Sequence, residues 1–518
     1  MKEFLTHHTG IVTSVLSGFD RLVFRGHLLP LMRAGGMFFF LEAARMRLLD
    51  FKKYVTATSQ RLKEAALAEA IRGNRPVVYL ESSATSKEEL AGKLLAEHPR
   101  KRPGLICAFK TVEPCMTFEY HRSKEKSERG LRLRPGKCLH IYKYYRHPTF
   151  GFMNARIQTW FPFNIQICLN GREWLGRQLE RRRLRFERAD NCFTSLGSPE
   201  IAQRLMNEQL QCDWPTELTA IARILNPIHE EIFAPSPMDY YWSVYQSEWA
   251  TDLLFQSKEA LASIYPSLVR FGLENLKSPD VMRFLGRKLN GNFKGESTTS
   301  YKNRIEGVRV KHWVNGNSVK MYDKAGCILR VETTMANTSD FKVLRPRHDD
   351  PDEKLEWQPL RKGVADIHRR AEVSQRSNER YLDALSVVED TTPCSHIFDA
   401  VARPVVCDGR RFRAMRIGDA EDIALLEAIS RGEFVTAGFR NRDIQKYLYP
   451  GALKAPTKER RRISAKITRQ LRLLRAHGII KKINRTYRYQ LTKRGRQLTA
   501  ALQAARSSNL NQALQQTG

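Results

Sequence analysis

The segment from Lys454 to Arg496 limits most strongly what this chain can fold into. It contains 16 Lys and Arg residues and one acid, Glu459. Apolar residues recur in it at three- and four-residue spacing, which is typical of a helix with one buried face. They are Ile463, Ile467, Leu471 and Leu474. The segment therefore predicts an amphipathic helix inside a strongly basic domain.

The residues around this helix predict the order helix, helix, helix, hairpin, helix. Two helices precede it, ending at Gly432 and near Pro450, and two β-like runs follow it. The segment "LRLLRAHGIIKKINRTYRYQLTKRGR" resembles the recognition helix and wing of winged-helix transcription regulators of the MarR type. The resemblance implies a winged helix-turn-helix domain at 418–506. A disordered tail is expected at 507–518.

In domains of that family the third helix lies in the major groove, and the wing contacts the minor groove or the backbone. Winged helices also serve as protein-interaction modules, and a run of charge is often only a solvated surface. The concentration of charge favours nucleic-acid contact. The resemblance implies contacts from the helix through Arg462, Lys466, Arg469, Arg472 and Arg475, and from the wing through Lys481, Lys482, Arg485, Tyr487 and Arg488.

Length and net charge extend these expectations to the whole chain. Single cores stop growing at about 250–300 residues, so the 518 residues predict two or three domains. The 87 Lys and Arg against 55 Asp and Glu give +32, far more than solubility requires. Nucleic acid is the expected partner, with DNA favoured and RNA possible. With no secretory signal and no apolar run of about 18 residues, we expect a cytoplasmic protein without a membrane partner.

The rest of the chain predicts an α+β, multidomain protein. Residues 1–116 predict a mixed α/β unit, in which a strand-helix-strand order after residue 75 favours parallel pairing. Residues 117–400 predict a central body of antiparallel sheet and helices. Its strands are expected within 117–170 and 309–343, and its helices mainly at 171–290.

Nine cysteines are scattered singly, without any CxxC pair. This pattern argues against a disulfide framework and against a zinc ribbon. Buried or incidental thiols are the expected outcome.

The clearest candidate for chemistry is a three-stranded meander, "VKHWVNGNSVKMYDKAGCILRVETTMAN". Its "YDK…LRVE" pattern resembles a hairpin in rolling-circle replication initiators of plasmids and filamentous phages. The resemblance implies Tyr322 or Tyr301 as the nucleophile, Asp323 and Glu332 as ligands of Mg²⁺ or Mn²⁺, and Lys324 or Arg330 as the group that stabilises the phosphate. The His-hydrophobic-His metal motif of that family is missing. A hairpin whose Arg330 and Glu332 only pair with neighbours is the alternative.

Two further groups of residues are weaker candidates. Tyr241, Tyr245, Glu248 and Asp252 recur at three- and four-residue spacing, which predicts one face of a helix. The two tyrosines could act in successive strand transfers and the two acids could bind a metal ion, but packing is favoured over catalysis. Aromatic and basic residues interleave at 140–172, which favours stacking on unpaired bases or, equally, a sheet core. The nucleic-acid contacts expected there are Tyr144, Arg146 and Arg156.

Together these features predict a nucleic-acid-binding protein of a mobile element, phage or plasmid. A nicking, replication-initiating or transposase-like enzyme is the favoured class, with Mg²⁺ or Mn²⁺ as the cofactor if the protein is catalytic. The alternative is a non-catalytic transcriptional regulator or an RNA-binding protein of a ribonucleoprotein complex.

Overall fold

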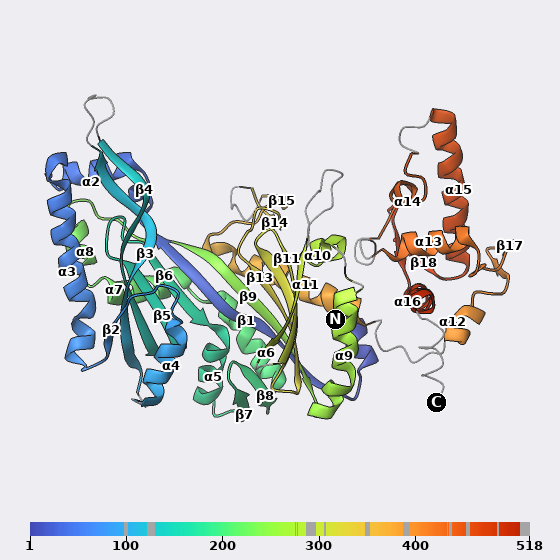
Figure 1. The fold of residues 1–518 in the computed structure, drawn as a ribbon, viewed down its shortest axis with the longest axis horizontal. Helices are drawn as coiled ribbons and strands as arrows, with labels where there is room; N and C mark the ends of the chain where they lie inside the picture. Colours follow the sequence, from blue (N-terminus) through green and yellow to red (C-terminus); the bar gives the residue numbers. More distant parts are fainter. Residues whose placement is uncertain are drawn as a thin grey trace.

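An 11-stranded β-sheet forms the body of the protein (Figure 1). The computed structural model describes residues 1–97, 102–121, 130–274, 276, 278–285, 297–304, 307–347, 353–386, 394–431, 434, 438–451, 456–483 and 486–507. In spatial order the strands are β10 (Thr298–Arg304), β11 (Gly307–Val314), β12 (Asn317–Lys324), β13 (Ile328–Met335), β9 (Tyr241–Phe255), β1 (Val12–His27), β6 (Ile165–Asn170), β5 (Gly151–Gln158), β4 (Gly130–His147), β3 (Gly104–His121) and β2 (Val77–Leu80).

The long strands β1 and β9 pair antiparallel and join the two halves of this sheet, as Figure 1 shows. β1 also pairs with β6, and β9 with β13. The boundary suggested by the sequence between residues 116 and 117 falls inside β3, so the two expected units share one sheet. β2 and β3 pair in parallel, which confirms the prediction from the strand-helix-strand order, and the sheet is therefore mixed.

Local patterns predicted some of these strands and missed others. The two hairpin turns of the meander are confirmed, with left-handed backbone at Asn315–Gly316 and Ala325–Gly326. The helix expected from residue 247 is wrong, because residues 247–255 belong to β9 and α9 (Lys258–Glu274) begins only afterwards. Residues 249–255 are buried throughout. An apolar run of that kind satisfies helical and strand spacing alike.

Helices pack on both halves of the sheet. Against β9 to β13 lie α1 (Lys2–His7), α9, α10 (Ser278–Phe284) and α11 (Ile367–Leu385), which share a core with Leu253, Val331 and Tyr381. The larger core of the other half includes Phe24, Phe40 and Phe161. The helices around it are α2 (Ala34–Ala43), α3 (Phe51–Arg72), α5 (Gly171–Arg181), α6 (Pro199–Glu208), α7 (Trp214–Leu225) and α8 (His229–Phe233).

Smaller elements complete the body. α4 (Lys87–Glu97) covers Cys107, Phe109 and Tyr144 at the β2–β4 end of the sheet. The short hairpins are β7 (Phe186–Ala189) with β8 (Cys192–Leu196), and β14 (Lys342–Arg345) with β15 (Glu356–Pro359).

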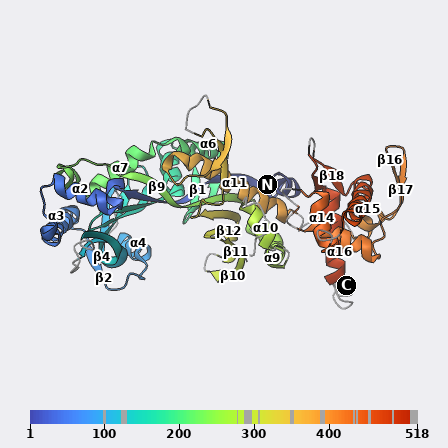
Figure 2. The ribbon, with the colours of Figure 1, turned by 90° about the horizontal axis from the view of Figure 1, so that it is seen from above.

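The C-terminal residues form a unit with its own core, seen at one end of the molecule near the N-terminus in Figures 1 and 2. Ile467, Leu471 and Leu474 are buried in that core, as their spacing predicts. An ion pair of 2.6 Å between Arg496 and Glu3 joins the unit to the body. Its elements are α12 (Cys394–Asp399), β16 (Val405–Cys407), β17 (Arg410–Phe412), α13 (Ala420–Ser430), α14 (Asn441–Leu448), α15 (Thr457–Ala476), β18 (Ile480–Lys482), β19 (Tyr489–Leu491) and α16 (Lys493–Ser507).

Asn378 of α11 fastens this helix to two strands of the sheet. Its Nδ2 donates to the carbonyl oxygens of Trp249 and Val331 at 3.0 and 3.1 Å, and its Oδ1 accepts from the Thr333 hydroxyl at 2.7 Å. The side chain is fully buried. Removing one buried partner leaves the others unsatisfied, which costs more than the hydrogen bonds themselves.

We expect Asn378→Leu to lower the free energy of unfolding by about 3 kcal/mol, because the polar groups that it served stay buried. Urea unfolding followed by circular dichroism measures the change. Arg376→Ala, at an exposed position of the same helix, should shift it by less than about 0.5 kcal/mol. Equal effects of the two substitutions would contradict this role for Asn378.

Candidate functional site

Three carboxylates from three neighbouring strands converge at the centre of the sheet. They belong to Asp20 on β1, Glu248 on β9 and Glu332 on β13, and one oxygen of each lies within 4.8 Å of the other two. Asp20 and Glu332 are buried, and Glu248 is partly exposed. We call these three residues the carboxylate cluster.

The strand register explains why they meet. Glu248 lies opposite Thr334 on β13 and opposite Arg21 on β1. Strand alternation gives Thr334 and Glu332 the same face. A β-bulge next to Arg21 leaves Asp20 without a ladder partner on β9. Bulges re-aim side chains and occur often beside active sites.

Hydrogen bonds and ion pairs hold Glu332 and Asp20 in place. Lys320 Nζ lies 2.6 Å from Glu332 Oε1, and the Tyr322 hydroxyl donates to Glu332 Oε2 at 2.9 Å. Arg330 Nη1 lies 3.4 Å from Asp20 Oδ2. Asn191, in the β7–β8 turn, donates through Nδ2 to both oxygens of Asp20 at 3.0 Å. Both carboxylates therefore have fixed positions.

Asp252 is a fourth carboxylate beside the cluster. Arg330 Nε lies 2.5 Å from Asp252 Oδ1, and Arg172 Nη2 lies 3.0 Å from Asp252 Oδ2. Among the described residues, three cations are in ion-pair contact with these four carboxyl groups, and they are Lys320, Arg330 and Arg172. Glu248 is the carboxyl group without an ion pair among these residues.

The surplus of negative charge appears in the pKa values. Burial, followed by repulsion from Glu332, raises the pKa of Glu248 to about 7. Burial also raises the pKa of Asp20. For Glu332, burial acts upward, but attraction by Lys320 and Arg330 outweighs it and the pKa lies below its ordinary value. Near neutral pH, Glu248 is therefore one position at which the cluster can hold a proton.

The structure places Asp323 and Glu332, the two metal ligands expected from the sequence, on opposite faces of the sheet. Asp323 follows Tyr322 directly in β12, so the two side chains point to opposite faces of the sheet. Glu332 shares its face with Tyr322, and its neighbours there are Asp20 and Glu248 instead of Asp323.

The other candidate residues in and beside the meander differ in how close they lie to the cluster. Tyr322 is 8% exposed and Arg330 is fully buried, so neither presents its polar group to solvent as a nucleophile or a phosphate ligand would. Lys324 Nζ binds Asp190 at 3.0 Å, at the edge of the cluster. Tyr301, on β10, is exposed. Its ladder partner Val310 belongs to the core, so Tyr301 lies on the face of the sheet away from the carboxylate cluster.

The sequence had singled out Glu248 and Glu332 of the cluster and the adjacent Asp252, but not Asp20. Glu248 and Asp252 share a face, as expected for a helix, because a spacing of four is also even and so keeps one face of a strand. Asp20 was missed because β1 was missed. The apolar and β-branched run "VTSVLSGFDRLVF" around it is the signal that predicts a buried strand.

Basic and aromatic pairs flank the cluster on the same sheet face. The Arg25 guanidinium lies 3.4 Å from the ring centre of Tyr245, which is 40% exposed. On the other side, Lys311 Nζ lies 4.2 Å from the ring centre of Trp313. Cation and aromatic pairs of this kind serve single-stranded nucleic acids through phosphate and base contacts.

The expected aromatic sheet contacts at 140–172 are only partly available. Tyr144 is 3% exposed and packs against Phe109 and Phe152, so no base can stack on it. Arg156 Nη1 lies 2.5 Å from Glu113. Arg146 lines a cavity of about 570 Å³.

That cavity adjoins the carboxylate cluster through Asn191, which lines it and contacts Asp20. Three arginines, Arg146, Arg177 and Arg188, contribute to its wall. Its other lining residues are Glu88, Gly92, Leu95, Phe152, Asn170, Glu173 and Asp190.

The C-terminal unit presents most of the predicted basic contacts to solvent. On α15 the exposed ones are Arg462, Arg469, Arg472 and Arg475, and on β18 Lys481 and Lys482 are exposed. Tyr487 is 85% exposed. Lys466 pairs with Glu421 at 2.8 Å, and Arg488 donates to the Gly438 carbonyl at 3.1 Å. Arg485 lies outside the described residues.

No protein-family model, curated protein or solved structure matches the chain. In the part of the chain that the structure describes, no helix is long and apolar enough to cross a membrane.

Glu248→Gln should change stability with pH in a defined direction. The pKa of Glu248 rises from 4.5 to about 7 on folding, so wild-type stability is lost as pH rises through this window. The neutral variant avoids this loss. In metal-free buffer we expect it to gain on the order of 3 kcal/mol at pH 8 relative to wild type and almost nothing at pH 4.

Urea unfolding at pH 4, 6 and 8 measures this difference. Glu372→Gln, on the exposed side of α11, is the matched control and should show no such trend. A gain for Glu248→Gln that is equal at pH 4 and pH 8 would rule out the raised pKa as its cause.

Proposed function

We propose that the chain is a nucleic-acid-binding enzyme that cleaves or transfers DNA strands with a divalent cation held by Asp20, Glu248 and Glu332. The convergence of these three carboxylates from adjacent strands carries the proposal. Mg²⁺ and Mn²⁺ prefer carboxylate oxygens. A cation there would lower the pKa of bound water and neutralise charge on a reacting phosphate.

The electrostatics of the cluster support this assignment. Buried carboxylates are costly without compensating charge, and the cations in contact with this group leave one carboxyl group uncompensated. The proton that Glu248 retains to about pH 7 marks where a metal ion would bind in its place. Arg146, Arg177 and Arg188 line the adjoining cavity and carry guanidinium groups of the kind that bind phosphate oxygens. Arg177 pairs with Glu180 at 3.0 Å and Arg188 pairs with Glu173, so a phosphate would replace these carboxylates as their partner.

Tyr322 and Arg330 have roles in this proposal that follow from their contacts. Arg330 positions Asp20 and Asp252, and Tyr322 positions Glu332. A covalent protein–DNA adduct that disappears in Tyr322→Phe would instead identify Tyr322 as a nucleophile of the kind used by replication initiators.

We also propose that the C-terminal unit is a winged helix that binds duplex DNA. α13, α14 and α15 precede the β18–β19 hairpin, and a bridge between Phe439 and Tyr489 adds a third extended segment. In this arrangement α15 would enter the major groove and the hairpin would be the wing. A nicking, replication-initiating or transposase-like enzyme of a mobile element, phage or plasmid would combine such a reader with a strand-processing site.

A non-catalytic role is the second candidate, and the ion pairs at the cluster favour it. Lys320 and Arg330 already compensate Glu332, Asp20 and Asp252 in part. The body would then be a scaffold, and the protein a transcriptional regulator or an RNA-binding component of a ribonucleoprotein complex.

Strand cleavage separates the two candidates. Labelled single- and double-stranded DNA and RNA are incubated with the protein and Mg²⁺, Mn²⁺ or EDTA, and then denatured. We expect metal-dependent cleavage of DNA, reduced on the order of 100-fold or more in Asp20→Asn and Glu332→Gln because a metal ligand is lost. Asp323→Asn, in the same meander but on the opposite face, is the matched control and should cleave normally. Intact substrate that is retained in a salt-sensitive manner would establish the non-catalytic binder.

The C-terminal proposal predicts a change in salt dependence. Each lost phosphate contact lowers the slope of log K against log salt by roughly one. We expect the double variant Arg469→Ala and Arg472→Ala to lower it by about two on duplex DNA. Arg270→Ala, at an exposed position of α9, should leave it unchanged. Fluorescence anisotropy at several salt concentrations measures the slopes, and an unchanged slope in the double variant would place the interface elsewhere.

A further inference from the structure

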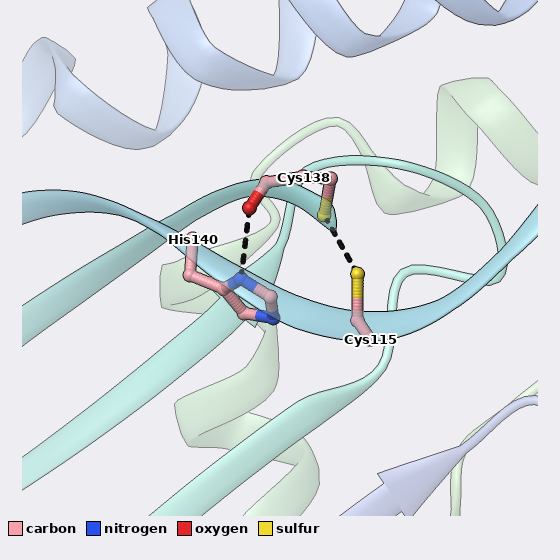
Figure 3. Close-up of side chains that lie close together, drawn as sticks. All are labelled: Cys115, Cys138 and His140. Atoms are coloured by element: carbon pink, nitrogen blue, oxygen red, sulfur yellow. Dashed lines mark hydrogen bonds between the residues drawn. The ribbon is translucent and has the colours of Figure 1, made fainter. Parts of the chain in front are cut away.

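Two cysteines and a histidine come together on the β3–β4 hairpin, as Figure 3 shows. Cys115 Sγ lies 3.3 Å from Cys138 Sγ, and His140 Nδ1 lies 3.2 Å from the Cys138 carbonyl oxygen. One ligand atom of each residue lies within 4.8 Å of the other two. This thiol–imidazole cluster shares no residue with the carboxylate cluster.

The hairpin register brings the three side chains to one face. Cys138 and His140 are two residues apart on β4, which gives them the same face. On β3, Cys115 lies opposite Gly136 of β4, and Glu113 lies opposite Cys138. Cys115 and Cys138 are therefore diagonal neighbours across the ladder. Cys115 and Cys138 are not part of a CxxC motif, so no local sequence pattern indicated that they would meet.

We propose that Cys115, Cys138 and His140 bind Zn²⁺. Two thiolates and one imidazole form a donor set that zinc accepts, with a water molecule in the fourth position. Binding releases the two thiol protons to solvent, so that a dication is held by two anionic ligands and one neutral ligand.

The surroundings of the cluster favour metal binding. In the tautomer with a proton on Nδ1, His140 donates to the Cys138 carbonyl and leaves Nε2 for a metal ion, an arrangement typical of metal-binding histidines.

The position of the cluster suggests what the metal ion does. Pro114 lies opposite Lys137, and Met116 lies opposite Pro135. Proline has no N–H to donate, so neither Pro114 nor Pro135 can donate a backbone hydrogen bond to the ladder. Cys115 and Cys138 lie diagonally across the ladder at this stretch. A zinc ion there would link the two strands beside these prolines.

Metal titration of the full chain tests the proposal. The protein is purified with a reducing agent, stripped with a chelator and titrated with Zn²⁺ in competition with a chromophoric chelator, and separately with Co²⁺. We expect one equivalent of Zn²⁺, thiolate-to-cobalt absorption in the near ultraviolet, and a Tm that rises with Zn²⁺. Cys138→Ser and His140→Ala should weaken binding by more than the roughly 10- to 100-fold that loss of a supporting residue costs.

Matched controls keep the result specific. Cys212→Ser, at another partly buried cysteine, should bind Zn²⁺ like wild type, and so should Asp20→Asn in the carboxylate cluster. Circular dichroism checks that each variant folds, and Cys115→Ser replaces Cys138→Ser if the latter does not. Zinc binding that is equal in wild type and in folded Cys115→Ser or His140→Ala would overturn the proposal, as would a wild type without the cobalt-thiolate band.

Discussion

The ion pair between Arg330 and Asp252 is the interaction on which the centre of the structure depends. Arg330 is fully buried on β13 and binds Asp252 on β9, while its third nitrogen lies near Asp20 on β1. Removing one partner of such a pair leaves an uncompensated buried charge, which typically costs 3–5 kcal/mol. The pair therefore fixes three strands against each other in one register. That register places the carboxylates of Asp20, Glu248 and Glu332 together.

On the opposite face of the same strands, side chains of α11 donate hydrogen bonds to the main chain. Asn378 and Arg370 of α11 are buried and donate to main-chain oxygens of β9 and β13, including those of Trp249, Val244 and Met335. Burial lowers the pKa of Arg370 to about 10, so it stays charged at neutral pH. One face of the sheet is thus committed to packing on α11. The other face keeps the polar groups that can act on a ligand.

The two candidate metal sites differ in the chemistry of their ligands. The carboxylate cluster lies where β1, β9 and β13 meet and offers oxygen ligands, which suit Mg²⁺ or Mn²⁺. The thiol–imidazole cluster lies on the β3–β4 hairpin and offers sulfur and nitrogen, which suit zinc. The proposed catalytic ion and the proposed zinc ion therefore belong to different parts of the sheet. The proposed DNA reader is a third part, with a core of its own.

The sequence by itself determined the features that depend on local spacing. It predicted the meander with its turns at Asn315–Gly316 and Ala325–Gly326, the parallel β2–β3 pair, and the buried stripe Ile467–Leu471–Leu474 with exposed arginines beside it. Each follows from hydrophobic period, turn residues, element order or charge within one continuous stretch of chain.

Tertiary structure decided which distant residues meet. Asp20 joined Glu248 and Glu332 although more than 220 residues separate it from either, and Asp323 was turned away by strand alternation. The same is true of β9, whose apolar run fits helix and strand alike until β1 and β13 pair with its two edges. The physical reason is that ladder register and bulges are set by contacts across the sheet. No local window of sequence contains them.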